Sequence, residues 1–115
     1  VDARQLERMA ARSMSGLART GAAATNGSGD YAIAFSTHTD FRIKSGAEAR
    51  SSMQPQILSN DAMSPLFLAV IEATEEAIYN SLFKAVDTAG KQGRKIEALP
   101  LEPTLEILRK YRKIK

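Results

Sequence analysis

The chain of 115 residues contains no cysteine. This absence excludes disulfide bonds, thiolate catalysis and cysteine metal sites, but it leaves both reducing and oxidising compartments open. Histidine is almost absent as well, since His38 is the only one. His38 would act as a general base only if the fold brought a nucleophile to it, and we do not expect that role.

Long hydrophobic runs are also missing. The longest apolar stretch, Pro65 to Ile71, is far shorter than the roughly 20 residues that span a bilayer. The first residues lack the charged and apolar regions of a signal peptide. We therefore expect a soluble chain with no membrane partner, and the sequence leaves a cytoplasmic or a periplasmic location open.

The composition predicts one folded domain over residues 1–115, because 43% of the residues are hydrophobic and 25% are charged. The net charge of +3 is concentrated in the tail Arg109–Lys115. A basic helix end is favoured by the helix macrodipole, and no nucleic-acid recognition motif accompanies it, so we expect no nucleic-acid partner. The alternative is a non-catalytic helical interaction module that binds acidic partners or nucleic acid through this tail.

Local signals predict about three helices. Asp2 can cap a helix over Ala3–Ala18, with Gln5 as the reciprocal partner and Gly21 as the stop. Ser64 and Pro65 start a second helix that should run to about Thr88, ended by Gly90 and Gly93. Its apolar residues cover more than one stripe, which predicts a central core helix buried between layers. Pro103 opens a last helix with an apolar edge at Leu105, Leu108 and Tyr111.

The strand signals are weaker. The segment 31–37 predicts a half-buried strand with Tyr31, Ile33 and Phe35 on one side. Residues 38–56 lack periodicity and predict a long loop, with short strands near 41–43 and 54–58. Another short strand is expected at 96–99. The chain is therefore predicted to be a helix-rich α+β fold.

The loop between the first helix and this strand is the candidate site. Its glycines Gly27 and Gly29 flank Ser28, and they allow positive φ and close approach by another group. Asp30, two residues on, can orient or polarise a hydroxyl or an amine. The plainer interpretation is an ordinary Asn-Gly and Ser-Gly turn.

Three carboxylates, Glu72, Glu75 and Glu76, lie about one turn apart on the second helix. They could form a metal site, but no histidine stands nearby, and such carboxylates more often form a solvated or ion-paired face. We expect no metal and no cofactor, and we assign these residues a structural role.

Most of the chain resembles the small subunit of the DmpA-type self-cleaving aminopeptidases, which include L-aminopeptidase/D-esterases and β-peptidyl aminopeptidases. The likeness is weakest over residues 39–53. It is carried by three blocks: Leu17–Gly21 with Asn26–Asp30 and Ala34–Thr37; Asn60–Phe67 with Val70–Ile78 and Asn80–Leu82; and Gly93–Lys95 with Ala98–Leu101.

The resemblance implies a four-layer αββα sandwich (DmpA/ArgJ-like), to which this chain gives about three helices and a few strands. In this family the precursor cuts itself, and the new N-terminal serine becomes the nucleophile with its own amine as base. Ser28 matches a second active-site serine, and Asp30 matches an acidic position where some members carry glutamate. Asn26, Gly27 and Gly29 would shape the loop.

The family's small subunit begins with a serine-led strand, and by the matching pattern Val1 lies just beyond it. The nucleophile is thus not in this sequence, and we expect the upstream segment to be omitted or to form a separate chain. The chain alone would be inactive. The implied partners are the larger subunit of the same precursor, a short peptide, amide or ester substrate, and further copies in a homo-oligomer of heterodimers. Whether an L-, D- or β-residue is released stays open, and acyl transfer to an amino acid, as in ornithine acetyltransferases, is a weaker match.

Overall fold

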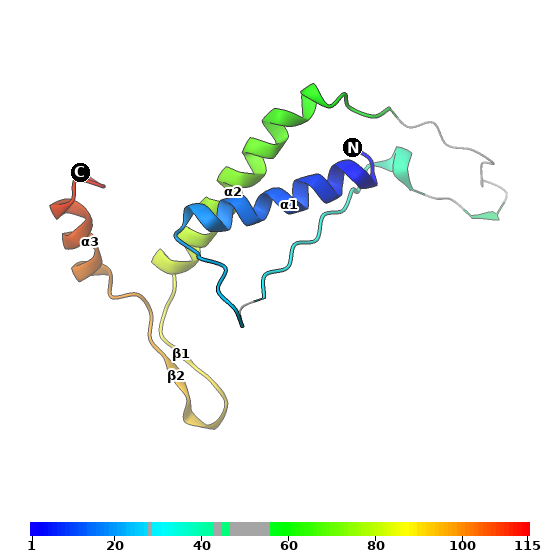
Figure 1. Ribbon diagram of the computed structural model, residues 1–115. Coiled ribbons are helices and arrows are strands. Elements are labelled where there is room, and N and C mark those ends of the chain that lie inside the picture. Colours follow the sequence, from blue (N-terminus) through cyan, green and yellow to red (C-terminus); the bar gives the residue numbers. More distant parts are fainter. Residues whose placement is uncertain (28, 43–44, 47–55) are drawn as a thin grey trace. The chain divides into compact units, whose positions relative to one another are not determined.

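The structure is a computed structural model that describes residues 1–27, 29–42, 45–46 and 56–115 (Figure 1). The chain divides into two compact units, Val1–Glu75 and Glu76–Lys115. The described elements are α1 (Ala3–Arg19), η1 (Thr39–Phe41), η3 (Asp61–Met63), α2 (Ser64–Phe83), β1 (Thr88–Ala89), η4 (Lys91–Gly93), β2 (Lys95–Ile96) and α3 (Leu101–Lys110). This is an α+β fold, as predicted. In the described part of the chain, no helix is long and apolar enough to cross a membrane.

Helix α1 begins with the predicted capping box. The Asp2 carboxylate accepts from the Gln5 backbone N–H at 2.7 Å, and the Gln5 side-chain oxygen accepts from the Asp2 N–H at 3.1 Å. The helix ends one residue after the predicted Ala18. Gly21 follows with φ +91°, and its N–H donates to the Ala18 carbonyl at 3.1 Å. The start and the stop are therefore set by the expected local residues.

The first unit has a small interior. Met63 and Gln5 have fully buried side chains, with 0% and 1% exposure. The Gln5 amide nitrogen donates to the Leu58 carbonyl oxygen at 2.7 Å. Since its oxygen already accepts from Asp2, both ends of the buried amide are hydrogen-bonded, and the start of α1 is tied to the segment before η3.

Helix α1 and the part of α2 that belongs to this unit, residues 64–75, approach closely at Gly16 (Figure 1). A Cβ atom added at Gly16 would lie 2.6 Å from the Ile71 carbonyl oxygen and 2.7 Å from the Thr74 Cβ. An ion pair of 3.3 Å between Arg19 and Glu75 joins the same two helices near the end of α1. The absence of a side chain at Gly16 is what allows this contact.

Helix α2 starts at Ser64 as predicted but ends at Phe83, five residues before Thr88. Gly90 and Gly93 do not end it, because they lie in the hairpin that follows. The prediction that this helix is buried between layers is wrong for the described residues, since none of its residues is buried and Leu68 and Leu82 are 48% and 47% exposed. The described part of the first unit offers it one neighbouring helix, which covers a single side.

The second unit contains a short hairpin in which Thr88 pairs with Ile96 and Ala89 with Lys95. The Asp87 carboxylate lies 2.7 Å from the Lys95 Nζ and accepts from the Ala98 N–H at 2.9 Å. These hydrogen bonds need an extended backbone beside residues 87–89, which explains why the helix cannot continue to Thr88. Strand β2 ends at Ile96, short of the predicted Leu99.

Helix α3 begins at Leu101, two residues before the predicted start at Pro103. Pro103 lies in the first turn of the helix, where a backbone N–H has no partner within the helix, so the missing donor costs nothing. The basic residues Arg109 and Lys110 lie in its last turn.

The predicted strand over residues 31–37 is not formed. Tyr31, Ile33 and Phe35 are 94%, 89% and 76% exposed, so the expected half-burial is wrong as well. A strand needs a neighbour for its backbone hydrogen bonds, and in the described ranges the two short strands pair only with each other.

Only parts of the predicted long loop 38–56 are described. Residues 39–41 form the η1 turn instead of the start of a strand, and 56–58 are not a strand. The rest of the predicted strands at 41–43 and 54–58 lies outside the described residues. The prediction of one domain over residues 1–115 stays a prediction.

Candidate active site

The loop from Gly21 to Asp30 leaves the end of α1 through a series of positive φ angles. They occur at Gly21 (+91°), Ala24 (+46°) and Gly27 (+92°). The turn at Asn26 and Gly27 is the predicted Asn-Gly turn. Ala24 is the unusual member, because an alanine in this region costs free energy that glycine does not.

The predicted site residues stand on this loop, except that Ser28 lies outside the described residues. Asn26, Gly27, Gly29 and Asp30 are all exposed. An exposed carboxylate such as Asp30 can accept hydrogen bonds from a hydroxyl or an amine. A Cβ atom at Gly29 would lie 3.3 Å from the Tyr31 hydroxyl and ring, but the Tyr31 side chain is 94% exposed and can move, so this contact does not require glycine.

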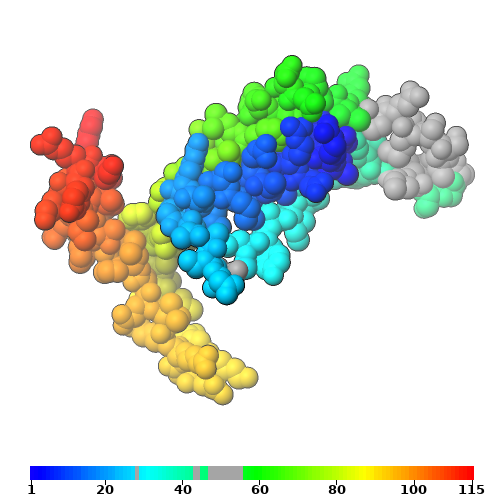
Figure 2. Space-filling model, in the orientation of Figure 1, coloured from blue at the N-terminus to red at the C-terminus, as the bar shows by residue number. Residues whose placement is uncertain are grey.

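The segment that follows the loop lies along the first half of α1. Ala32, Ile33 and Ala34 line a shallow hollow together with Leu6 and Ala10 of the helix. Figure 2 shows this segment, in cyan, beside the blue surface of α1. The loop is thus held between the end of α1 and a chain segment that runs back along the same helix.

His38 has a local role in the structure. Its Nδ1 accepts from the Asp40 backbone N–H at 3.3 Å and so caps the short η1 turn. The Asp40 carboxylate lies 3.8 Å from the same nitrogen. Because this ring nitrogen is used in the turn contact, the structure gives His38 a local structural role.

Two of the three glutamates of α2 make side-chain contacts of an ordinary kind. Glu75 pairs with Arg19, and Glu76 accepts from the Asn80 amide at 3.5 Å. Within the described ranges, no group of three or more histidine, cysteine, aspartate or glutamate residues is placed to hold a metal ion.

One set of contacts was not predicted from the sequence. The guanidinium groups of Arg8 and Arg12 lie over the Phe67 ring, with Cζ atoms 4.9 Å and 4.5 Å from its centroid. The four-residue spacing of Arg4, Arg8 and Arg12 was the available signal, because it places the three side chains on nearly the same face of a helix.

Two proteins with similar sequences are β-peptidyl aminopeptidases. A β-peptidyl aminopeptidase BapA from Sphingosinicella microcystinivorans is 39% identical over 110 residues, which cover 96% of this chain and 27% of that protein. A second β-peptidyl aminopeptidase BapA, from Sphingosinicella xenopeptidilytica, is 34% identical over 91% of this chain and 26% of its own length. The chain thus spans little more than a quarter of these relatives.

A solved structure and a protein-family model also match this chain. The crystal structure of the PH0078 protein from Pyrococcus horikoshii OT3 matches 94% of this chain and 30% of its own, with a TM-score of 0.79 and 47% identity. The model of Peptidase family S58 matches residues 1–96, which include the loop Asn26–Asp30. The resemblance drawn from the sequence motifs is confirmed, and the chain belongs to Peptidase family S58.

Proposed function

We propose that this chain is the small-subunit part of a self-cleaving N-terminal-serine aminopeptidase, which hydrolyses N-terminal residues of short peptides, amides or esters. The observation that carries the proposal is the match to two β-peptidyl aminopeptidases over 96% and 91% of this chain. Membership of a peptidase family over residues 1–96 supports the same chemistry.

The proposed reaction follows from the chemistry of an N-terminal serine. Its α-amino group titrates near neutrality, with a pKa of about 8 in model peptides, so it can take the hydroxyl proton without a histidine. The serine oxygen attacks the substrate carbonyl carbon and forms an ester with the acyl group. The amine that leaves takes up the proton that the α-amino group had accepted. Water then hydrolyses this acyl-enzyme ester and restores the serine hydroxyl. In this proposal another segment of the whole protein would supply the nucleophile.

In this proposal the loop Asn26–Asp30 supports the nucleophile. The Ser28 hydroxyl would hydrogen-bond beside the nucleophile, and the Asp30 carboxylate would orient that hydroxyl or the substrate amine. Asn26, Gly27 and Gly29 would shape the loop, and Asn26 could donate a hydrogen bond within it. The exposure of Asp30 is consistent with a partner group that comes from elsewhere in the whole protein.

We also propose that the chain forms part of a four-layer αββα sandwich with a larger subunit of the same precursor. The large side chains of Tyr31, Ile33 and Phe35 occupy alternate positions and are exposed, which supports this arrangement, because a segment with this pattern could pair as a strand with a neighbour from the larger subunit. The exposed Leu68 and Leu82 of α2 would be covered by another layer. Several such heterodimers would assemble into a homo-oligomer.

The first test is the intact mass of the full-length gene product under denaturing conditions. Self-cleavage predicts two polypeptides, the smaller of which extends this sequence upstream to a serine. A single uncut polypeptide would contradict the proposal. If two chains are found, Ser28→Ala and Asp30→Asn are expected to lower kcat by about 10² or more, as loss of an acid-base or oriented hydroxyl group does, while Ser59→Ala serves as a control outside the loop.

A further inference from the structure

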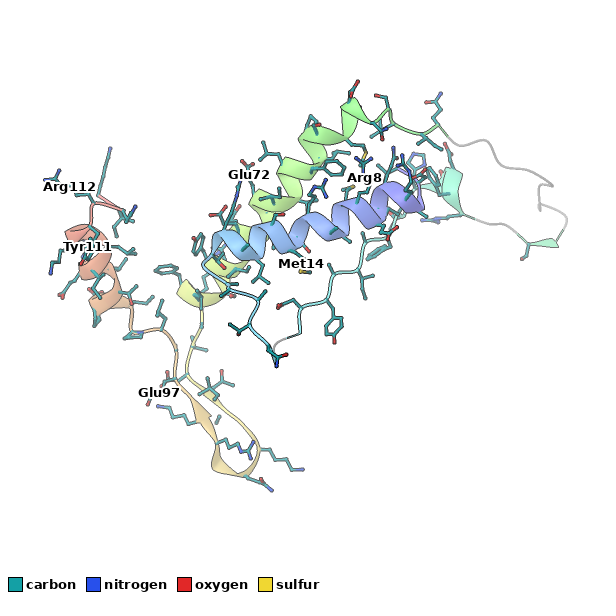
Figure 3. All side chains as sticks on the ribbon, viewed as in Figure 1. Arg8, Met14, Glu72, Glu97, Tyr111 and Arg112 are labelled. Carbon is teal, nitrogen blue, oxygen red and sulfur yellow. The ribbon has the colours of Figure 1, made fainter. Side chains whose placement is uncertain are left out.

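Helix α1 carries arginines at four-residue intervals, Arg4, Arg8 and Arg12, which we call the arginine row. Residues four apart lie on nearly the same face of a helix. A rise of about 1.5 Å per residue separates neighbouring arginines of the row by about 6 Å. Figure 3 shows Arg8 on the side of α1 that faces α2.

The arginine row is held in place by two neutral residues. The Phe67 ring lies under Arg12 and Arg8, 4.5 Å and 4.9 Å from the ring centroid to the Cζ atoms. The Asn60 side-chain oxygen accepts from Arg8 at 2.9 Å and from Arg4 at 3.3 Å. Stacking and a shared acceptor limit the rotamers of these long side chains before any ligand arrives.

The positive charge of the row is not matched by carboxylates in the described part of the chain. No aspartate or glutamate among the described residues forms an ion pair with Arg4, Arg8 or Arg12, whereas Arg19 of the same helix pairs with Glu75 at 3.3 Å. A guanidinium has several N–H donors in one plane. The contacts to Asn60 use one donor each from Arg4 and Arg8, Arg4 is exposed, and Arg8 and Arg12 are half-buried.

We propose that the arginine row, with Phe67 and Asn60, binds an extended acidic peptide segment whose carboxylates occupy alternate positions. Two residues of an extended chain advance about 6.6 Å, close to the rise of about 6 Å between the backbone positions of neighbouring arginines in the row. Carboxylates are planar and accept paired N–H donors from guanidinium groups. Glutamates four apart in a helix would give a similar spacing, but their repulsion destabilises an isolated helix. The site uses no residue of the loop Asn26–Asp30 and does not depend on peptidase activity.

The test is the affinity of the full-length protein for a fluorescent heptapeptide of alternating serine and glutamate, measured by anisotropy at constant ionic strength. The same peptide with glutamine is the reference. We expect the acidic peptide to bind at least about tenfold more tightly than the glutamine peptide, since hydrogen bonds between charged groups are stronger than those between neutral groups. Arg12→Gln should weaken it about tenfold, and Arg12→Lys about fivefold, because lysine keeps the charge but loses the planar fork.

The matched control is Arg109→Gln, which removes a charge from the last turn of α3 and should change the affinity less than about twofold. An equal loss of peptide affinity in Arg109→Gln and Arg12→Gln would overturn the proposal, because it would indicate that the peptide is attracted only by the net charge of the protein. Complete displacement of the peptide by millimolar inorganic phosphate at the same ionic strength would also overturn it. Circular dichroism checks folding, and if Arg12→Gln does not fold, the loss measured in Arg12→Lys decides.

Discussion

At the scale of single residues, Gly16 sets the distance between the two long helices. It is buried, and the Ile71 carbonyl and the Thr74 side chain fill the space where a Cβ atom would stand. A glycine inside a helix usually lowers its stability relative to alanine. Here the closer packing of α1 and α2 compensates for that loss.

Replacement of Gly16 by alanine should therefore destabilise the protein. The new methyl group would meet the Ile71 carbonyl oxygen at 2.6 Å, a backbone atom that moves only with its helix. After the gain in helix propensity, we expect a net loss of about 1 to 2 kcal/mol in the free energy of unfolding. Chemical denaturation measures it, and Ser15→Ala at the neighbouring exposed position is the control. Unchanged stability in Gly16→Ala would show that the helices are not this close.

At the scale of elements, the hairpin is held by the Asp87 carboxylate. The hydrogen bond from Lys95, and next the one from the Ala98 N–H, lower the pKa of Asp87 below its ordinary 3.8. A carboxyl group with a lowered pKa in the folded state adds stability above the unfolded pKa, and this contribution disappears as the pH falls through the folded pKa. The hairpin should thus be intact near neutral pH and weaken in acid.

An NMR titration of the Ala98 amide tests this directly. Its chemical shift should follow the protonation of Asp87, with a midpoint below 3.8. Asp87→Asn should remove that transition. Glu97→Gln is the matched control, since Glu97 lies 3.8 Å from the same Lys95 and is 80% exposed, and it should leave the transition in place. A midpoint at or above 3.8 would contradict the role of Lys95.

The elements also show which features were predictable from the sequence. The bounds of α1 and the Asn26–Gly27 turn depend on caps and glycines within a few residues, so local patterns predicted them. The end of α2 depends on the hairpin hydrogen bonds of Asp87, and a strand at 31–37 depends on a neighbour. The stacking of Arg12 on Phe67 joins distant parts of the sequence, which local patterns do not reveal.

At the scale of the whole molecule, the two units leave much apolar surface exposed. Ile33 and Phe35 in the first unit are 89% and 76% exposed, and Val86 and Ile96 in the second are 76% and 72% exposed. Large exposed apolar surface is unusual in a protein that works alone, and it marks surfaces that other chains or segments cover. This agrees with the proposed larger subunit.

Residues 1–115 produced alone should bind a hydrophobic dye such as ANS, and more strongly per molecule than the full-length protein does. The double variant Ile33→Ser and Phe35→Ser should reduce the fluorescence of the isolated chain. The double variant Thr25→Ser and Thr37→Ser, at exposed polar positions, should not. Equal dye binding by the isolated chain and the full-length protein would mean that these side chains stay exposed, against the proposed sandwich.

The buried Gln5 amide has a consequence for the distant loop. Its bond to Asp2 closes the cap of α1, and its bond to the Leu58 carbonyl ties the start of the helix to the segment before η3. The loop that carries Asp30 follows the opposite end of this 17-residue helix, about 25 Å away. A helix converts a tilt at its start into a larger displacement at its end. The hydrogen bonds of the Gln5 side chain therefore help to set the position of the loop that follows α1.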